Sequence, residues 1–149
     1  MDFRTACIVL VSVVALTCAE PVKYMDCGSS VGKVSNVDIK PCPKQPCQLH
    51  KGQSYNVNVT FNSAVESQTS KAIVHGIVAG IPLPFPIPID DGCLSGIACP
   101  IQKERSYNYV NDLPVKTAYP CIMLVVQWEL KDDTGKDLFC IEFPVQIVS

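Results

Sequence analysis

Three stretches of the chain alternate apolar and polar residues with a period of two. The clearest is SYNVNVTFN, residues 54–62, and the pattern recurs over residues 121–130 and 138–148. Because successive side chains of a strand point to opposite faces, the pattern predicts half-buried strands. No stretch has a sustained apolar period of 3.6 residues, so long amphipathic helices are not expected.

Weaker strand signals occupy the intervals between these stretches, at residues 22–27, 31–39, 71–79 and 106–110. The run KDDTGKD, residues 131–137, predicts a hairpin turn between the last two strands. Turn signals recur about every 8–12 residues, which is typical of an antiparallel sandwich or barrel. We therefore expect a single all-β domain of about seven strands.

Prolines alternate with large apolar residues in GIPLPFPIPIDDGC, residues 80–93. Proline has no N–H to give to a sheet, so this stretch is an edge strand or a loop. In extended backbone its apolar residues would share one side, and an apolar partner should cover them. LPVKTAYPC, residues 113–121, is a second segment framed by prolines. Either these segments close a solid core, or they hold two sheets apart over an apolar slot, and composition alone does not decide.

The first residues, MDFRTACIVLVSVVALTCA, predict a signal peptide over residues 1–19. The alternative, a membrane anchor, is disfavoured because the apolar run from Ala6 to Leu16 is shorter than the roughly 20 residues that span a bilayer. Residues 20–149 then form the exported domain.

Seven of the nine cysteines lie outside residues 1–19, and thiols of exported proteins normally pair. CPKQPC and CLSGIAC each close a short loop, which predicts the pairs Cys42–Cys47 and Cys93–Cys99. Among Cys27, Cys121 and Cys140, the residues themselves do not identify the unpaired one. A metal site is disfavoured because the chain has no C-x-x-C.

The net charge argues against nucleic-acid binding, and the small number of catalytic residue types argues against catalysis. The net charge is −2 and no basic stripe occurs, so a nucleic-acid partner is not expected. The two histidines are His50, beside a turn, and His75, within a strand, and G-x-S-x-G and H-E-x-x-H are both absent. The chain is therefore not expected to be an enzyme, and no cofactor or metal is predicted.

Several runs, in order along nearly all of residues 20–149, resemble the ML-domain lipid-binding family of sterol carriers. They are DCGS, PCPKQPCQL, KGQSYNVNVTF, HGIVAGIPLPFPIP, CPIQKERSYNY, LPVKTAYP and FCIEFPVQIV. The resemblance implies an immunoglobulin-like β-sandwich of two sheets with an apolar slot between them. It also implies that the protein is a secreted carrier that binds unesterified cholesterol in the lysosome lumen. A secreted adhesion module with a solid core is the rival hypothesis, and a lipid extract of the purified protein separates the two.

The resemblance assigns residues to the slot and to the disulfides. It implies the disulfides Cys27–Cys140, Cys42–Cys47 and Cys93–Cys99, which leaves Cys121 as the free thiol. The residues that it implies for sterol binding are Phe85, Val115 and Tyr119, with Tyr55, Ile122, Leu124, Val126 and Trp128 as deeper walls.

The resemblance further implies a contact surface for anionic lysosomal membranes and for the membrane-bound Niemann-Pick type C protein 1. This surface is the run His75, Gly76, Ile77, Val78, Ala79, Gly80 and Ile81, in which Ala79 stands where the family has a larger methionine. Lys51 and Asp91 match charged positions at the slot rim, whereas Leu94 replaces a lysine of the family. Asn58 begins the one N-glycosylation sequon on the polar side of its strand, and the protein is expected to be a monomer.

Overall fold

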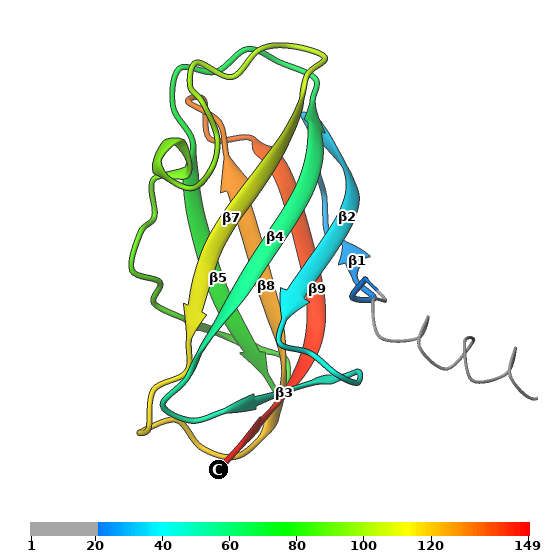
Figure 1. The fold of residues 1–149 in the computed structure, drawn as a ribbon. Helices are drawn as coiled ribbons and strands as arrows, with labels where there is room; N and C mark the ends of the chain where they lie inside the picture. Colours follow the sequence, from blue (N-terminus) through cyan, green and yellow to red (C-terminus); the bar gives the residue numbers. More distant parts are fainter. Residues whose placement is uncertain (1–20) are drawn as a thin grey trace, which may run out of the picture.

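The protein is a sandwich of two β-sheets in a computed structural model that describes residues 21–149 (Figure 1). The predicted signal peptide, residues 1–19, lies outside the described residues. The larger sheet has the order β1-β9-β8-β5-β6, with β3 also paired to β9, and the smaller sheet has the order β2-β4-β7. The strands are β1 (Met25–Asp26), β2 (Gly32–Lys40), β3 (Cys47–His50), β4 (Ser54–Ser63), β5 (Lys71–Val78), β6 (Ile81–Pro84), β7 (Ser106–Pro114), β8 (Met123–Lys131) and β9 (Asp137–Val148).

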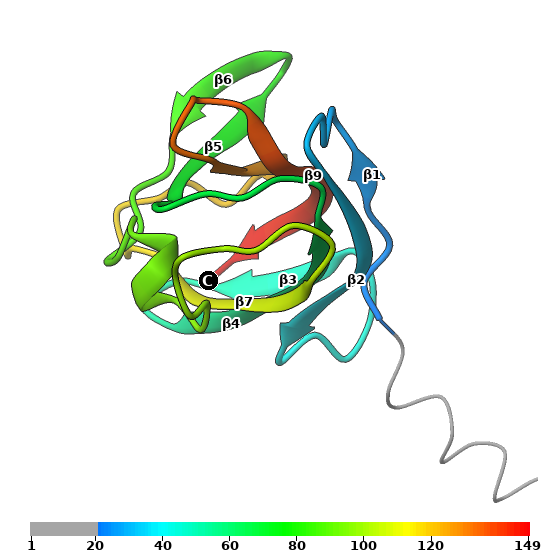
Figure 2. The same cartoon turned by 90° about the horizontal axis from the view of Figure 1, so that it is seen from above.

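Figure 2, a view from above, shows the two sheets facing each other across the core. The predicted all-β fold class is confirmed, and so is the immunoglobulin-like sandwich that the resemblance implies. The described residues contain one short 3₁₀ turn, Gly92–Leu94, and no helix among them has the length and apolar character needed to cross a bilayer.

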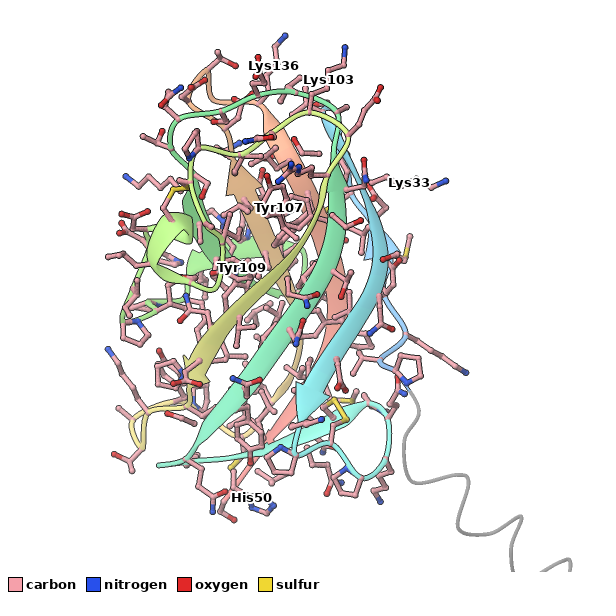
Figure 3. The ribbon with its side chains drawn as sticks, turned by 45° about the horizontal axis from the view of Figure 1, so that its top comes forward. Lys33, His50, Lys103, Tyr107, Tyr109 and Lys136 are labelled. Atoms are coloured by element: carbon pink, nitrogen blue, oxygen red, sulfur yellow. A yellow bond between two sulfur atoms is a disulfide. The ribbon has the colours of Figure 1, made fainter. Side chains whose placement is uncertain are left out.

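The period-two pattern places one face of each central strand in the core. On β4, Tyr55, Val57, Val59 and Phe61 are fully buried, and the residues between them face outward. At the centre, the Oη atom of Tyr109 accepts hydrogen bonds from Trp128 Nε1 at 3.1 Å and from Asn111 Nδ2 at 2.9 Å. Burial raises the pKa of Tyr109 to about 12, against the opposing effect of these hydrogen bonds. Figure 3 labels Tyr109 within the sandwich and Lys33 on its outside.

The described residues form nine strands instead of the expected seven, and the two additional short strands are β3 and β6. β3 pairs in parallel with the second half of β9, next to the point where β1 pairs antiparallel with its first half. Four residues, CQLH, are too few to show a periodic signal. β1 and β3 together protect one side of β9 from pairing with another chain.

β6 forms the opposite edge of the larger sheet and contains the first prolines of the alternating stretch. Its Pro82 and Pro84 lie opposite Ile77 and His75 of β5, and an edge position tolerates their missing N–H groups. The expectation that an apolar partner covers the whole apolar row is wrong. Phe85 is 6% exposed, but Ile81, Leu83 and Ile89 are 61%, 47% and 42% exposed. The smaller sheet has three strands, too few to extend beneath this edge.

Three disulfides stabilise the sandwich, and they are the three pairs that the resemblance implies: Cys27–Cys140, Cys42–Cys47 and Cys93–Cys99. Cys121 is an exposed free thiol. The predicted hairpin turn is also present. The carboxylate of Asp132 accepts hydrogen bonds from the backbone N–H groups of Thr134 and Lys136, both at 2.9 Å.

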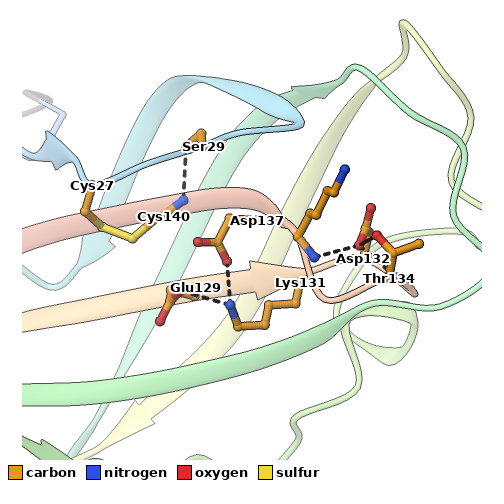
Figure 4. A network of polar contacts seen from close by, with 9 residues as sticks. Cys27, Ser29, Glu129, Lys131, Asp132, Thr134, Asp137 and Cys140 are labelled. Atoms are coloured by element: carbon orange, nitrogen blue, oxygen red, sulfur yellow. Dashed lines mark hydrogen bonds and ion pairs between the residues drawn. A yellow bond between two sulfur atoms is a disulfide. The ribbon is translucent and has the colours of Figure 1, made fainter.

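A polar network lies on the outer face of the larger sheet, beside the Cys27–Cys140 disulfide (Figure 4). Lys131 Nζ lies 3.2 Å from Glu129 Oε2 and 3.1 Å from Asp137 Oδ1, so one cation serves two carboxylates. Burial raises the pKa of Asp137 and the Glu129 carboxyl raises it further, against the opposing effect of Lys131. Asp137 is therefore easier to protonate in the folded protein than in the unfolded chain.

From this network we predict that protonation of Asp137 stabilises the folded protein as the pH falls. A carboxyl whose pKa is raised by folding binds its proton more tightly in the folded state. The stabilisation that comes from this proton is therefore lost as the pH rises through the folded pKa. We expect Asp137→Asn to be more stable than the unmodified protein at pH 7 and to lose that advantage toward pH 4. Urea unfolding at several pH values measures this, with Asp112→Asn on the other sheet as control. An equal pH dependence for the Asp137→Asn variant and the unmodified protein would contradict the prediction.

Candidate functional site

An apolar pocket of about 150 Å³ opens at the end of the sandwich where β5 ends and β8 begins. Its walls come from β5, β6, β8, β9 and the loop before β8. The lining residues are Gly76, Val78, Leu83, Pro84, Phe85, Tyr119, Pro120, Ile122, Leu124 and Ile147. Apart from the Tyr119 hydroxyl, none of these side chains carries a polar atom, so the pocket suits a hydrocarbon guest.

Gly76 provides space in the inner face of β5. A Cβ atom at this position would lie 2.9 Å from Leu124 Cδ1 and 3.3 Å from Phe85 Cδ2. Those distances are shorter than ordinary contacts, so any larger residue would displace the side chains around the pocket. The absent side chain of Gly76 therefore allows Leu124 and Phe85 to pack closely against β5 at the pocket.

Two aromatic rings from different loops meet at the pocket. The centroids of Phe85 and Tyr119 are 5.2 Å apart and their planes make an angle of 72°, an edge-to-face arrangement. Phe85 is fixed by a hydrogen bond of 3.0 Å from its backbone N–H to the Val74 carbonyl. Burial raises the pKa of Tyr119, so its hydroxyl is neutral at any physiological pH.

The pocket brings together four of the eight residues that the resemblance implies for sterol binding, namely Phe85, Tyr119, Ile122 and Leu124. The other four do not line it. Val115, Val126 and Trp128 are fully buried in the core, and Tyr55 is buried beside a separate surface depression. The Tyr55 hydroxyl accepts a hydrogen bond of 2.7 Å from the His50 N–H.

The core beyond the pocket is filled by side chains. Leu124, Val126 and Trp128 lie in a row on the inner face of β8 and lead from the pocket into the core, and the last two are 0% exposed. A volume of about 150 Å³ is below the roughly 300–1,000 Å³ typical of sites for drug-sized ligands. The pocket is therefore smaller than the slot that the resemblance implies.

The run His75–Ile81 is divided between two faces of the sheet. Gly76 and Val78 line the pocket, whereas His75 and Ile77 lie on the outer face. Ala79 and Gly80 form the turn to β6 with φ values of 50° and 82°. The left-handed region is unfavourable for larger side chains, which is consistent with a small residue at position 79.

Three exposed apolar side chains lie beside the pocket or next to its lining residues. Ile81, Leu83 and Met123 are 61%, 47% and 58% exposed, and we call them the mouth patch. Leu83 belongs to the apolar row that was expected at the mouth of the site, whereas Met123 and Ile147 were not expected there. The proline-alternating stretch was a signal for Leu83, but no signal set the other two apart from ordinary strand residues.

The predicted rim charges lie outside this pocket. Lys51 is in the turn between β3 and β4, and its N–H donates to the Val148 carbonyl at 3.0 Å. The backbone of Asp91 forms a β-bridge with Lys71 at the start of β5, whereas the pocket lies at the end of that strand. Leu94 is exposed in the adjacent 3₁₀ turn, and Asn58 is half-buried on the outer face of β4.

One group of potential metal ligands occurs among the described residues: Glu129, Asp137 and Cys140. Cys140 is bonded to Cys27, and Lys131 lies between the two carboxylates. This group therefore has no free thiolate, and its two carboxylates already share the Lys131 ammonium.

Comparison with known proteins identifies the family. The model of the ML domain family matches residues 21–147. The chain belongs to the ML domain family. It is 69% identical over the full length of both chains to the zebrafish (Danio rerio) protein named NPC intracellular cholesterol transporter 2. It is 57% identical to the Bos taurus protein of the same name over 99% of each chain.

A solved ML domain structure also matches. A Niemann-Pick type C2 protein from Japanese carpenter ant superimposes with a TM-score of 0.79 at 28% identity, over 85% of this chain and 99% of that chain. The fold is thus that of a solved relative.

Proposed function

We propose that this protein carries unesterified cholesterol, bound in the apolar pocket, through the lumen of the lysosome. The observation that carries the proposal is an almost purely apolar pocket at the end of a sandwich whose full-length relatives are named cholesterol transporters. No bond needs to be made or broken in this function. Equilibrium binding of cholesterol to the purified protein tests the proposal.

The binding free energy can be estimated from the apolar area of the sterol that the pocket removes from water. A sterol that buries about 300 Å² of apolar surface gains about 7 kcal/mol at 25 cal/mol/Å². The loss of translational and rotational freedom on association reduces this gain. Burial of a larger part of the sterol would bring the affinity into the micromolar range or tighter, which allows both retention and release.

The pocket has to widen before a sterol fits, and outward movement of the loop before β8 would widen it. Its ends are held, since Val115 exchanges backbone hydrogen bonds with Gln53 and Gly52, and the Ile122 carbonyl accepts from Ile147. Between these ends, the described backbone hydrogen bonds include one local bond, from Tyr119 to Lys116. We infer that residues 116–121 move outward with Tyr119 and that Val126 and Trp128 then become deeper walls.

The mouth patch would bring the pocket to a membrane surface. An exposed apolar patch beside a lipid pocket can insert among lipid chains and give the sterol a path that avoids water. The proposed acceptors are anionic lysosomal membranes and the membrane-bound Niemann-Pick type C protein 1. The signal peptide at residues 1–19 and a glycan on Asn58 belong to the same proposal, as parts of the secretory route to the lysosome.

Charged residues in the mouth patch should slow the transfer of sterol to membranes without weakening the binding of sterol. In the double variant Ile81→Asp with Met123→Asp, we expect transfer to anionic vesicles to slow by about tenfold or more, because two carboxylates must enter the interface. Equilibrium cholesterol affinity should change by less than about threefold, since neither side chain lines the pocket. Stopped-flow transfer of a fluorescent sterol measures the rate, with Ile73→Asp as a charged control farther along β5. Unchanged transfer by the double variant would count against the patch.

A further inference from the structure

The chain has three methionines, and two of them, Met25 and Met123, lie among the described residues. Met25 is 71% exposed and Met123 is 58% exposed. Methionine commonly fills gaps in protein cores, because its thioether is apolar and flexible. A thioether at the surface is instead within reach of oxidants dissolved in water. Both side chains are therefore open to chemical modification, and they differ in where they lie.

Met123 begins β8, between two residues that line the pocket. The strand register explains why its side chain is exposed. On one side Met123 lies opposite Gln146 of β9. On the other side, the pairing of β5 with β8 ends at Ile77 and Val125, so β5 does not flank Met123. The thioether therefore remains part of the mouth patch, next to the pocket but not in its lining.

Met25 provides the contrast within the same sheet. It lies on β1, which pairs with β9, and its partner there is Glu142. Met25 is the more exposed of the two methionines, but it is neither a lining residue nor a neighbour of one. An oxidant would reach both thioethers, and only one of them lies at the pocket.

We propose that Met123 is a site of oxidative modification at which a peroxide switches off sterol transfer to membranes. The inference rests on the proposed function, in which the mouth patch enters the membrane surface. The peroxide gives one oxygen atom to the Met123 sulfur: its O–O bond breaks and an S–O bond forms. The proton of that oxygen moves to the leaving oxygen, which departs as water or an alcohol. The sulfide is thereby oxidised to a sulfoxide and the peroxide is reduced, and a reductase that takes electrons from two thiols reverses the change.

Oxidation changes the mouth patch and leaves the pocket as it is. A sulfoxide is polar, so it has to lose hydrogen bonds to water before it enters among lipid chains. Ile81 and Leu83 keep their apolar side chains, and the contact is weakened instead of abolished. Because Met123 does not line the pocket, the affinity for sterol in water stays the same. The signature of the switch is slower transfer at unchanged affinity.

The test uses the purified protein with Cys121→Ser as the parent, since the exposed Cys121 thiol would also react with peroxide. After treatment with hydrogen peroxide, peptide mass spectrometry locates the added oxygen. Stopped-flow then measures the transfer of a fluorescent sterol to anionic vesicles. We expect transfer to slow by about 3- to 10-fold and equilibrium cholesterol affinity to stay within about twofold. Met123→Gln, which places a polar group of similar size there, should transfer slowly without any peroxide.

Two conservative variants of the same parent identify the residue. Met123→Leu keeps an apolar side chain of similar volume and should transfer at the full rate after peroxide treatment, whereas Met25→Leu should stay as sensitive as the parent. The inference is overturned, and the carrier function stands, if Met123→Leu is as sensitive as the parent or if Met123 acquires no oxygen. The same holds if oxidised Met123 leaves transfer unchanged, or if affinity falls as much as transfer. If the untreated parent transfers no sterol, the proposed function itself fails and this inference fails with it.

Discussion

Gly76→Leu is expected to abolish cholesterol binding while the protein remains folded. Gly76 lies on the inner face of β5 at the pocket, where even a Cβ atom would come too close to Leu124 and Phe85. An isobutyl group there would occupy the space of about 150 Å³ that the sterol has to enter and widen. We expect an affinity loss of about 100-fold or more, because each sterol would first have to displace the leucine.

The same substitution costs stability, so folding has to be measured with binding. Overpacking of a filled site typically costs about 1–3 kcal/mol, less than the stability of an ordinary domain. Ile73→Leu is the matched control, since it lies on the outer face of the same strand and conserves volume. If Gly76→Leu binds cholesterol within about threefold of the Ile73→Leu control, the sterol binds elsewhere on the protein.

Loss of the Cys27–Cys140 disulfide is expected to have the largest effect on stability. This bond joins residues 113 positions apart and connects the segment after β1 to the middle of β9. In the chain-entropy description, a loop of about that length restricts the unfolded chain by about 4–5 kcal/mol. Because a domain of this size is stable by about 5–15 kcal/mol, the double variant Cys27→Ser with Cys140→Ser should lose from about a quarter to nearly all of its stability.

The Cys42–Cys47 disulfide provides an internal comparison. It closes a loop of sequence separation 5, for which the same description gives about 2 kcal/mol. Urea unfolding of both double serine variants measures the difference, in a Cys121→Ser background that prevents the free thiol from exchanging with the remaining disulfides. Equal losses from the two pairs would contradict the expected dependence on loop length.

The strands that build the core could be predicted from the sequence because each has one apolar face and one polar face. On β4, buried Tyr55, Val57, Val59 and Phe61 alternate with outward-facing residues, so the period of two is visible without any structure. β3 has four residues and pairs in parallel along β9, and its formation depends on a neighbour distant in sequence. No local pattern carries that information.

The pocket could be predicted only in part, for a similar reason. Phe85 and Tyr119 lie in proline-framed segments that the sequence set apart, and both line the pocket. Val115 lies in one of the same segments but is buried in the core, since the direction of a loop side chain depends on the tertiary contacts around it. Asp91 was expected at the rim, yet it forms a β-bridge with Lys71 at the start of β5, whereas the pocket lies at the end of that strand.

For a sterol to bind, the end of the sandwich that holds the pocket has to open and admit one steroid nucleus. An equilibrium titration of the purified, unmodified protein with cholesterol tests it most directly. The predicted result is saturation at one sterol per chain with a dissociation constant in the micromolar range or tighter. Titration without saturation, or saturation that is identical in the Gly76→Leu variant, would contradict it.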